Sequence, residues 1–212
     1  MISRFLNALA GTRLYPITDR RPSGLSHLEQ VSQLSEAGAT LIQLREKLLS
    51  PLEFYREAEP ALRVARTRGV KIIVNDRVDI ALALKADGVH LGQDDIPPEA
   101  ARRLLGPNAI IGYSAHNLEQ ARRAAKMPLD YVAIGPIFET STKENPDSAI
   151  GLDGLQVAIQ EVGLPVVANG GITLANSLDV LAAGSHAVAV IKDIWILPGQ
   201  AMTQTRRLLH NT

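Results

Sequence analysis

Polar side chains gather in this chain where short apolar runs end. The segment QLREK places the long donors Gln43, Arg45 and Lys47 at alternate positions. Because successive side chains of a strand point to opposite faces, these three face the same side, and we expect them to project inward. A guanidinium beside an ammonium matches a pyrophosphate group, whereas burying both cations without an anion costs desolvation energy. The alternative is a rim salt bridge from either cation to Glu46 or Asp76.

Two carboxylates follow neighbouring apolar runs. Asp76 ends the run KIIVND, and Asp95 comes just after GVHLGQ. If these runs are adjacent parallel strands, the two carboxylates meet at one edge and can share a cation. Oxygen ligands completed by a phosphorylated substrate are typical of Mg²⁺ sites. The alternative is that Asp95, or Asp94, caps a helix beginning at Pro97 and Pro98.

A third polar cluster lies in IFETSTKENP, residues 137–146, where Thr140, Ser141 and Thr142 precede Lys143. Lys143 adds another cation to the two of QLREK and favours the phosphate interpretation. Asn169-Gly170-Gly171 and the run that ends in Ile191-Lys192 offer backbone N–H groups and one more ammonium for a phosphate. A Gly-Gly pair is equally typical of a tight turn.

The elements that must position these residues alternate regularly along the chain. Short aliphatic or β-branched runs are separated by amphipathic stretches of helical period, the pattern of parallel strands joined by crossover helices. The expected strands are residues 14–19, 41–47, 71–76, 88–93, 110–116, 131–138, 165–171 and 186–193. Residues 199–212 would form the last helix.

Eight such units in 212 residues, without a linker, predict an α/β fold with one closed (β/α)₈ TIM barrel. We expect a single domain over 1–212, with 1–12 as an N-terminal extension or short helix. The alternative, an open doubly wound sheet, usually has a Gly-rich turn after its first strand, where this chain has Thr18-Asp19-Arg20. In a barrel, the polar residues above would lie together at the carboxyl ends of the strands.

The composition narrows the classes of molecule that this chain is expected to bind. Lys plus Arg and Asp plus Glu are both 22, so no net charge steers the chain toward nucleic acid or an anionic membrane. There is no cysteine, and no apolar run approaches the ~18 residues needed to span a bilayer. We expect a cytoplasmic protein that binds small molecules rather than nucleic acid or membrane. A homodimer stays open, with Phe54 or Trp195 at the subunit contact.

The motifs QLREK, VNDR, HLGQDD, GYSAH, GPIFETSTK, NGGI and AVAVIKDI resemble, in order and spacing, those of the thiamine-phosphate synthase family. The resemblance covers nearly the whole chain. It implies a Mg²⁺-dependent transferase that joins 4-amino-2-methyl-5-hydroxymethylpyrimidine diphosphate to thiazole phosphate, giving thiamine phosphate and pyrophosphate.

The resemblance also implies roles for individual residues. The catalytic set would be Arg45, Lys47, Ser114 and Lys143. These residues, with Gln43 and Asn75, would bind the pyrimidine diphosphate, and Asp76 and Asp95 would bind Mg²⁺. The thiazole phosphate would be held by Thr140, Thr142, Gly171, Ile191 and Lys192.

The chemistry agrees with that set, because the difficult step is acceptance of negative charge by the departing pyrophosphate. Loss of pyrophosphate can leave a cation that the aminopyrimidine ring stabilises, so the thiazole nitrogen can attack without a protein nucleophile. Mg²⁺, Arg45, Lys47 and Lys143 would stabilise the leaving group.

Two positions depart from the family pattern. Lys192 replaces the usual serine, and it would grip the thiazole phosphate, obstruct it, or pair with Asp193 or another rim acid. Asn169 stands where an aliphatic residue is usual. Two other functions therefore stay open. One is a thiazole tautomerase, in which His116 would move a proton. The other is a barrel that binds the ligands without turnover.

Overall fold

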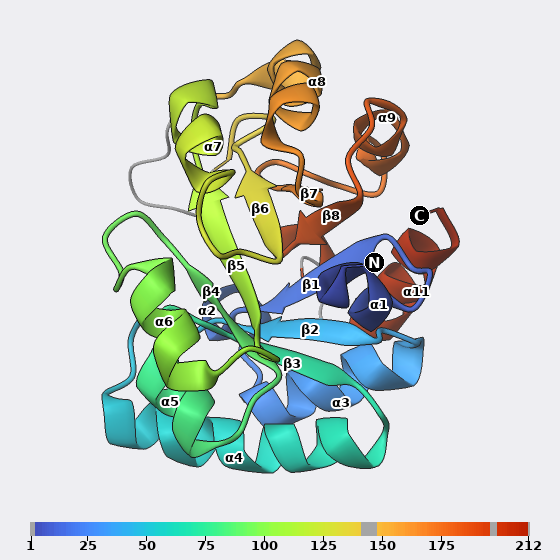
Figure 1. Cartoon of the computed structure of the whole chain (residues 1–212). Coiled ribbons are helices and arrows are strands. Elements are labelled where there is room, and N and C mark those ends of the chain that lie inside the picture. The colour runs from blue at the N-terminus through green and yellow to red at the C-terminus, as the bar shows by residue number, and fades with distance from the viewer. Residues whose placement is uncertain (1–2, 141–147, 196–198, 212) are drawn as a thin grey trace.

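The strands close into one ring (Figure 1). The computed structural model describes residues 3–140, 148–195 and 199–211. Each strand pairs in parallel with the next, and β1 pairs with β8 through Leu14 and Val188. The strands are β1 (Leu14–Thr18), β2 (Leu41–Leu44), β3 (Lys71–Asn75), β4 (Gly88–Leu91), β5 (Ile110–Ala115), β6 (Tyr131–Ile134), β7 (Val166–Ala168) and β8 (Ala187–Val190). Closure confirms the predicted (β/α)₈ barrel and excludes the open sheet.

Helices surround the ring. They are α1 (Arg4–Leu9), α2 (Arg20–Ser23), α3 (His27–Ala37), α4 (Pro51–Thr67), α5 (Val78–Ala83), α6 (Pro98–Leu105), α7 (Leu118–Ala124), α8 (Gly151–Val162), α9 (Ser177–Ala182), α10 (Lys192–Trp195) and α11 (Ala201–Asn211). The strands are shorter than the apolar runs, so the polar residue at the end of most runs lies in the loop that follows. Among the described residues, no helix has the length and apolarity that a membrane crossing requires.

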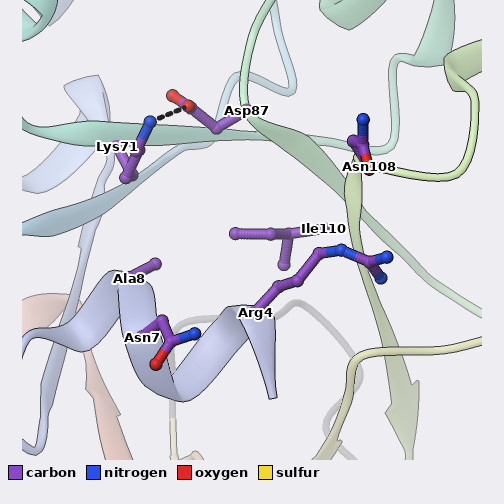
Figure 2. Close-up of a pocket in the computed structure, with 7 residues that line it drawn as sticks. All are labelled: Arg4, Asn7, Ala8, Lys71, Asp87, Asn108 and Ile110. Carbon is purple, nitrogen blue, oxygen red and sulfur yellow. Dashed lines mark hydrogen bonds and ion pairs between the residues drawn. The ribbon is translucent and has the colours of Figure 1, made fainter. Parts of the chain in front are cut away.

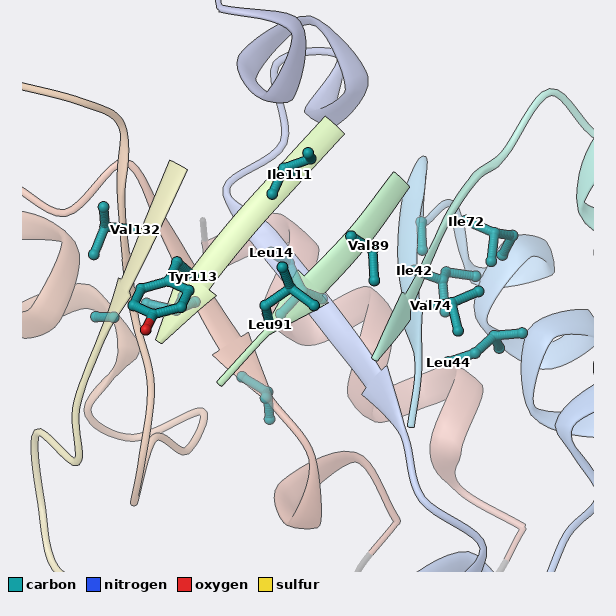
Figure 3. Close-up of a cluster of buried hydrophobic side chains, with 14 of the residues drawn as sticks. Leu14, Ile42, Leu44, Ile72, Val74, Val89, Leu91, Ile111, Tyr113 and Val132 are labelled. Atoms are coloured by element: carbon teal, nitrogen blue, oxygen red, sulfur yellow. The ribbon is translucent and has the colours of Figure 1, made fainter. Parts of the chain in front are cut away.

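Alternation along the strands divides the core into two layers. In β2, Ile42 and Leu44 pack outward against the helices, while Leu41 belongs to the cluster inside the barrel. Figure 3 shows the outward layer continuing through Ile72, Val74 and neighbouring strands. The parity of β2 turns Gln43 inward, as the sequence predicted.

The helix α1 closes the amino-terminal end of the barrel. Phe5 is fully buried, and its ring stacks on Tyr131 with centroids 4.1 Å apart. Beside α1 lies a hollow of about 270 Å³ lined by Arg4, Asn7, Ala8, Lys71, Asp87, Asn108 and Ile110 (Figure 2). Its cations already have partners: Lys71 Nζ is 2.8 Å from Asp87, and Arg4 Nη1 is 3.2 Å from Asp130. This hollow is at the opposite end of the strands from the predicted site.

Phe54 and Trp195 are not available for a subunit contact. Phe54 is 1% exposed and Trp195 is 4% exposed within the chain. Trp195 Nε1 donates a hydrogen bond to the carbonyl of Ile17, 3.4 Å away. The expectation that these residues lie at a subunit contact is therefore wrong, because both complete the core of one barrel.

Candidate active site

The loop after β2 carries two cations, and both have acidic partners. Lys47 Nζ donates to Asp76 at the end of β3, which is one of the rim salt bridges considered from the sequence. The Arg45 guanidinium instead donates to Asp19, a buried carboxylate at the end of β1 that the sequence did not suggest. Burial lowers the pKa of Arg45, and the neighbouring Asp19 carboxylate opposes that shift. The tips of β1, β2 and β3 thus form one charged cluster.

The two predicted metal-binding aspartates are adjacent. Burial raises the pKa of Asp95, and the negative charge of the nearby Asp76 carboxylate raises it further. Asp76 has a left-handed backbone with φ of 61°, and its N–H donates to the carbonyl of His90 at 2.8 Å. That bond ties the end of β3 to β4, which brings the aspartates together.

The capping alternative for Asp95 is wrong. The helix α6 begins at Pro98, and the residue before it, Pro97, supplies no side-chain cap. Asp95 Oδ2 instead accepts a hydrogen bond from the N–H of Gly92 at 2.7 Å. This bond folds the loop after β4 back toward Asp76.

The two carboxylates fit a divalent cation whose remaining ligands come from a bound substrate. Two close carboxylates, one of them with a raised pKa, favour a positive charge beside them. Here the Lys47 ammonium contacts the Asp76 carboxylate. Across the described residues, no cluster of three or more His, Cys, Asp or Glu side chains could hold a metal by itself. Magnesium commonly takes one or two carboxylates and completes its shell with water and phosphate oxygens.

A chain of hydrogen bonds crosses the barrel interior from Gln43 to Ser114. Gln43 Nε2 donates to Tyr15 Oη at 3.1 Å, and Tyr15 Oη lies 3.0 Å from Tyr131 Oη. His90 connects Tyr131 to Ser114, because its Nδ1 is 2.9 Å from Tyr131 Oη and its Nε2 is 2.8 Å from Ser114 Oγ. Burial raises the pKa of both tyrosines, so their hydroxyls stay protonated. Two predicted substrate-binding residues are therefore oriented by the same buried network.

Sequence reasoning overlooked His90, Tyr15 and Tyr131. The signal that could have found His90 is strand parity, because its register partner is Asn75, a predicted site residue. Asn75 is itself buried, two positions after the interior residue Ile73. The tyrosine pair carries no comparable local signal, since its members are 116 residues apart.

The loop after β6 is described only in part. Thr140 is half-buried, whereas Thr142 and Lys143 lie outside the described residues. The beginning of the loop packs against the Gly-Gly pair after β7. A Cβ on Gly170 would come within 2.5 Å of Pro136, and one on Gly171 within 2.7 Å of the carbonyl oxygen of Glu139. The tight-turn interpretation of this pair is supported, because both glycines have positive φ and allow a close contact between two loops.

The end of β8 differs from the predicted strand. β8 stops at Val190, and Lys192 begins the short helix α10 as an exposed residue. Asp193 Oδ2 accepts hydrogen bonds from the N–H of Leu174, at 3.0 Å, and from Gln204 Nε2, at 2.6 Å. Asp193 thus links the loop after β7 to α11. Because β8 pairs with β1, Gly171, Ile191 and Lys192 border the same mouth as the charged cluster.

His116 is held by the loop after β6. Its Nδ1 lies 2.9 Å from the carbonyl oxygen of Gly135, which can only accept, so Nδ1 carries the proton. The N–H of His116 donates to Gln120 Oε1 at 2.7 Å. Both bonds give His116 a structural role at the end of β5.

A closed (β/α)₈ barrel with carboxylates and cations gathered at the carboxyl ends of its strands has the architecture of a barrel enzyme. Comparison with known proteins is more specific. A family model described as thiamine monophosphate synthase matches residues 14–194. A thiamine-phosphate synthase of Chloroflexus aurantiacus is 48% identical over 183 residues, which cover 86% of this chain and 84% of that relative. The chain belongs to the thiamine monophosphate synthase family.

Two further relatives agree. A thiamine-phosphate synthase of Clostridium novyi is 45% identical over 183 residues, covering 86% of this chain and 90% of that protein. Among solved structures, a thiamine phosphate pyrophosphorylase from Pyrococcus furiosus superposes with a TM-score of 0.87 at 38% identity, covering 98% of this chain and 97% of that one. The similarity thus extends over the whole barrel.

Proposed function

We propose that this chain joins 4-amino-2-methyl-5-hydroxymethylpyrimidine diphosphate to thiazole phosphate, releasing pyrophosphate and forming thiamine phosphate. The observation that carries the proposal is that the charged cluster at the tips of β1, β2 and β3 continues to Asp95 after β4, so that Lys47, Asp76 and Asp95 converge. Such a cluster suits a diphosphate bound together with a divalent cation. The matching relatives are named thiamine-phosphate synthases, and thiamine phosphate is the product of the coupling proposed here.

In the proposed complex, the pyrimidine ring lies over the interior network. Gln43, Asn75 and Ser114 face that space and supply the hydrogen-bonding groups that orient the ring. Arg45, Lys47 and Lys143 hold the diphosphate. Asp76 and Asp95 would hold Mg²⁺, which when bound neutralises charge on the diphosphate oxygens.

Two bonds change in the reaction. The methylene carbon of the pyrimidine loses its bond to the diphosphate oxygen, whose electron pair leaves with pyrophosphate. The thiazole nitrogen then gives its lone pair to that carbon. The reaction requires no nucleophile from the protein, so the task of the chain is to fix positions and offset the developing negative charge.

The second substrate would bind on the opposite side of the mouth. Thr140, Thr142, Gly171, Ile191 and Lys192 would surround the thiazole phosphate, with backbone N–H groups and the Lys192 ammonium as donors. A homodimer and a cytoplasmic location stay predictions.

The deciding experiment mixes both substrates with purified protein and Mg²⁺ and measures thiamine phosphate by chromatography. Product formation that is lost when a chelator is added supports the proposal. Interconversion of thiazole tautomers without coupling would identify a tautomerase. Binding of both substrates without either reaction would identify a non-catalytic barrel, and both of these outcomes overturn the proposal.

A further inference from the structure

The residue between the two site cations is directed into the protein. The Glu46 side chain is only 5% exposed, although it lies in a surface loop. Its Oε1 accepts hydrogen bonds from three successive backbone N–H groups: Lys47 at 2.8 Å, Leu48 at 2.7 Å and Leu49 at 3.3 Å. A single carboxylate oxygen therefore shapes the segment that carries Lys47.

A fully buried histidine lies next to the other oxygen of this carboxylate. His27, the first residue of α3, has its Nε2 atom 3.4 Å from Glu46 Oε2. This separation is long for a hydrogen bond, and His27 Nε2 has no hydrogen-bond partner among the described residues. The His27 ring is packed in place by Phe54, with ring centroids 5.6 Å apart. The Arg20 guanidinium also lies near Oε2, with its Nη1 atom 3.9 Å away.

The contacts continue from His27 to the second cation. His27 Nδ1 lies 3.0 Å from Thr18 Oγ1, and the same hydroxyl oxygen accepts a hydrogen bond from the N–H of Arg45 at 3.2 Å. Thr18 and His27 are both 0% exposed. With Nδ1 facing the Thr18 hydroxyl, the other ring nitrogen, Nε2, is directed at Glu46.

These contacts form a closed path. It runs from the Arg45 N–H through Thr18, His27 and Glu46 to the Lys47 N–H. Each cation of the proposed diphosphate site thus has its backbone fixed by the same buried group of three side chains. None of the three reaches the mouth of the barrel, because all are nearly or fully buried.

We infer that Glu46, His27 and Thr18 are positioning residues that hold Arg45 and Lys47 at the spacing a diphosphate requires. The inference rests on the proposed function. Two cations on a short loop repel each other, and a loop without this support would sample many arrangements before binding. A buried carboxylate that fixes the loop beforehand removes that ordering cost from substrate binding.

The test compares Glu46→Ala and His27→Asn with the unmodified protein. We expect the KM for the pyrimidine diphosphate to rise by roughly tenfold or more, because small displacements of positioning groups have effects of that size. The KM for thiazole phosphate should stay within about twofold, since its proposed ligands lie on other strands. Glu46→Gln keeps an oxygen for the three N–H groups and should restore most of the lost affinity.

Glu53→Ala is the matched control. Glu53 caps α4 through Ser50 at the same loop–helix junction, but among the described residues it makes no hydrogen bond or ion pair with Arg45 or Lys47. It therefore reports what the loss of a structural carboxylate does alone. Circular dichroism and inorganic pyrophosphate binding by calorimetry accompany the kinetics, and His27→Asn carries the test if Glu46→Ala does not fold.

Arg45→Ala and Lys47→Ala separate failure of this inference from failure of the proposed function. If these two variants weaken diphosphate binding while Glu46→Ala and His27→Asn behave like Glu53→Ala, the positioning role is overturned and the site stands. If Arg45→Ala and Lys47→Ala leave diphosphate binding unchanged, the proposed site itself is wrong. A selective rise in the diphosphate KM for the buried variants supports the inference.

Discussion

The ammonium of Lys47 and the carboxylate of Asp76 form an ion pair across the tips of β2 and β3. In the proposed complex, Lys47 binds the diphosphate and Asp76 binds a metal. Lys47 therefore exchanges one anion, the Asp76 carboxylate, for another, and Asp76 exchanges the Lys47 ammonium for a metal cation. The ion pair therefore keeps both groups near their working positions and limits the charge left uncompensated at the mouth.

Asp76→Asn should remove the dependence of the coupling reaction on Mg²⁺ together with most of its rate. Asparagine suits the positive φ of 61° at this position better than alanine, so the change alters charge with little backbone strain. Rates are measured over a Mg²⁺ titration. Asp94→Asn, the same change beside Asp95, should leave the titration curve in place; an unaltered curve for Asp76→Asn would refute the metal assignment.

Lys192→Ser tests the departure at the start of α10. If the ammonium holds the thiazole phosphate, its loss should raise the KM for that substrate by roughly tenfold, a cost typical of one charge-assisted hydrogen bond. The KM for the pyrimidine diphosphate should not change. Faster turnover would show instead that the lysine obstructs the site. Lys126→Ser, between α7 and β6 at the other end of the barrel, serves as the comparison.

Tyr131→Phe should destabilise the barrel. Its hydroxyl lies between Tyr15 Oη and His90 Nδ1, and removing it leaves both buried groups short of a partner. The expected loss in unfolding free energy is about 1–3 kcal/mol, measured by denaturant titration. Tyr55→Phe is the control, because Tyr55 is half-buried in α4 outside this network. Equal stabilities of the two variants would contradict the role of the network.

Gly171→Ala should lower the free energy of unfolding by more than the strain of a positive φ alone explains. A Cβ there would lie 2.7 Å from Glu139 O, and φ is 66°. At Gly163 the φ is nearly the same, 63°, but no atom lies within 4 Å. Thermal unfolding should show a loss of about 1–2 kcal/mol for Gly163→Ala and a larger loss for Gly171→Ala. A higher KM for thiazole phosphate is expected only in the latter.

Glu46 should contribute stability that disappears in acid. Burial opposes ionisation of Glu46, but the adjacent His27 and hydrogen bonds from the backbone N–H groups of Leu48 and Leu49 outweigh it and lower the pKa to about 2 from 4.5. A lowered carboxyl pKa stabilises the folded state fully above pH 4.5, and that contribution is lost as pH falls through about 2.

The comparison with Glu46→Gln measures this contribution. After allowance for solvent screening, the unfolding free energies of the two proteins should differ by a pH-dependent part of roughly 2 kcal/mol. That part should be present at pH 6 and shrink steadily toward pH 3. A difference that stays constant with pH would show that Glu46 ionises normally.

Much of the fold could be predicted because its signals are local. Each strand shows its apolar run, and barrel closure follows from the number of such runs without a linker. Strand parity likewise predicted that Gln43 faces inward. The end of β8 was less predictable, because the apolar run through Ile191 does not show where pairing stops and α10 begins.

The candidate site was predicted in its position and only partly in its contacts. The adjacency of Asp76 and Asp95 followed from neighbouring strands. The partner of Arg45 did not, since Asp19 is 26 residues away and looks like an ordinary turn residue. The sequence offered Glu46 as an alternative rim partner for the cations, whereas its side chain is buried against His27. Thr142 and Lys143 stay predictions outside the described residues.

By itself, the sequence determined which residue types stand at the ends of the strands and which side of each strand they face, because alternation is a property of the local backbone. Only the tertiary structure decided which of them touch. The chain from Gln43 to Ser114 joins five strands, and the path from Arg45 to Lys47 passes through the first turn of α3. Such contacts depend on barrel closure, which brings distant segments together and excludes water between them, so polar groups must pair with one another.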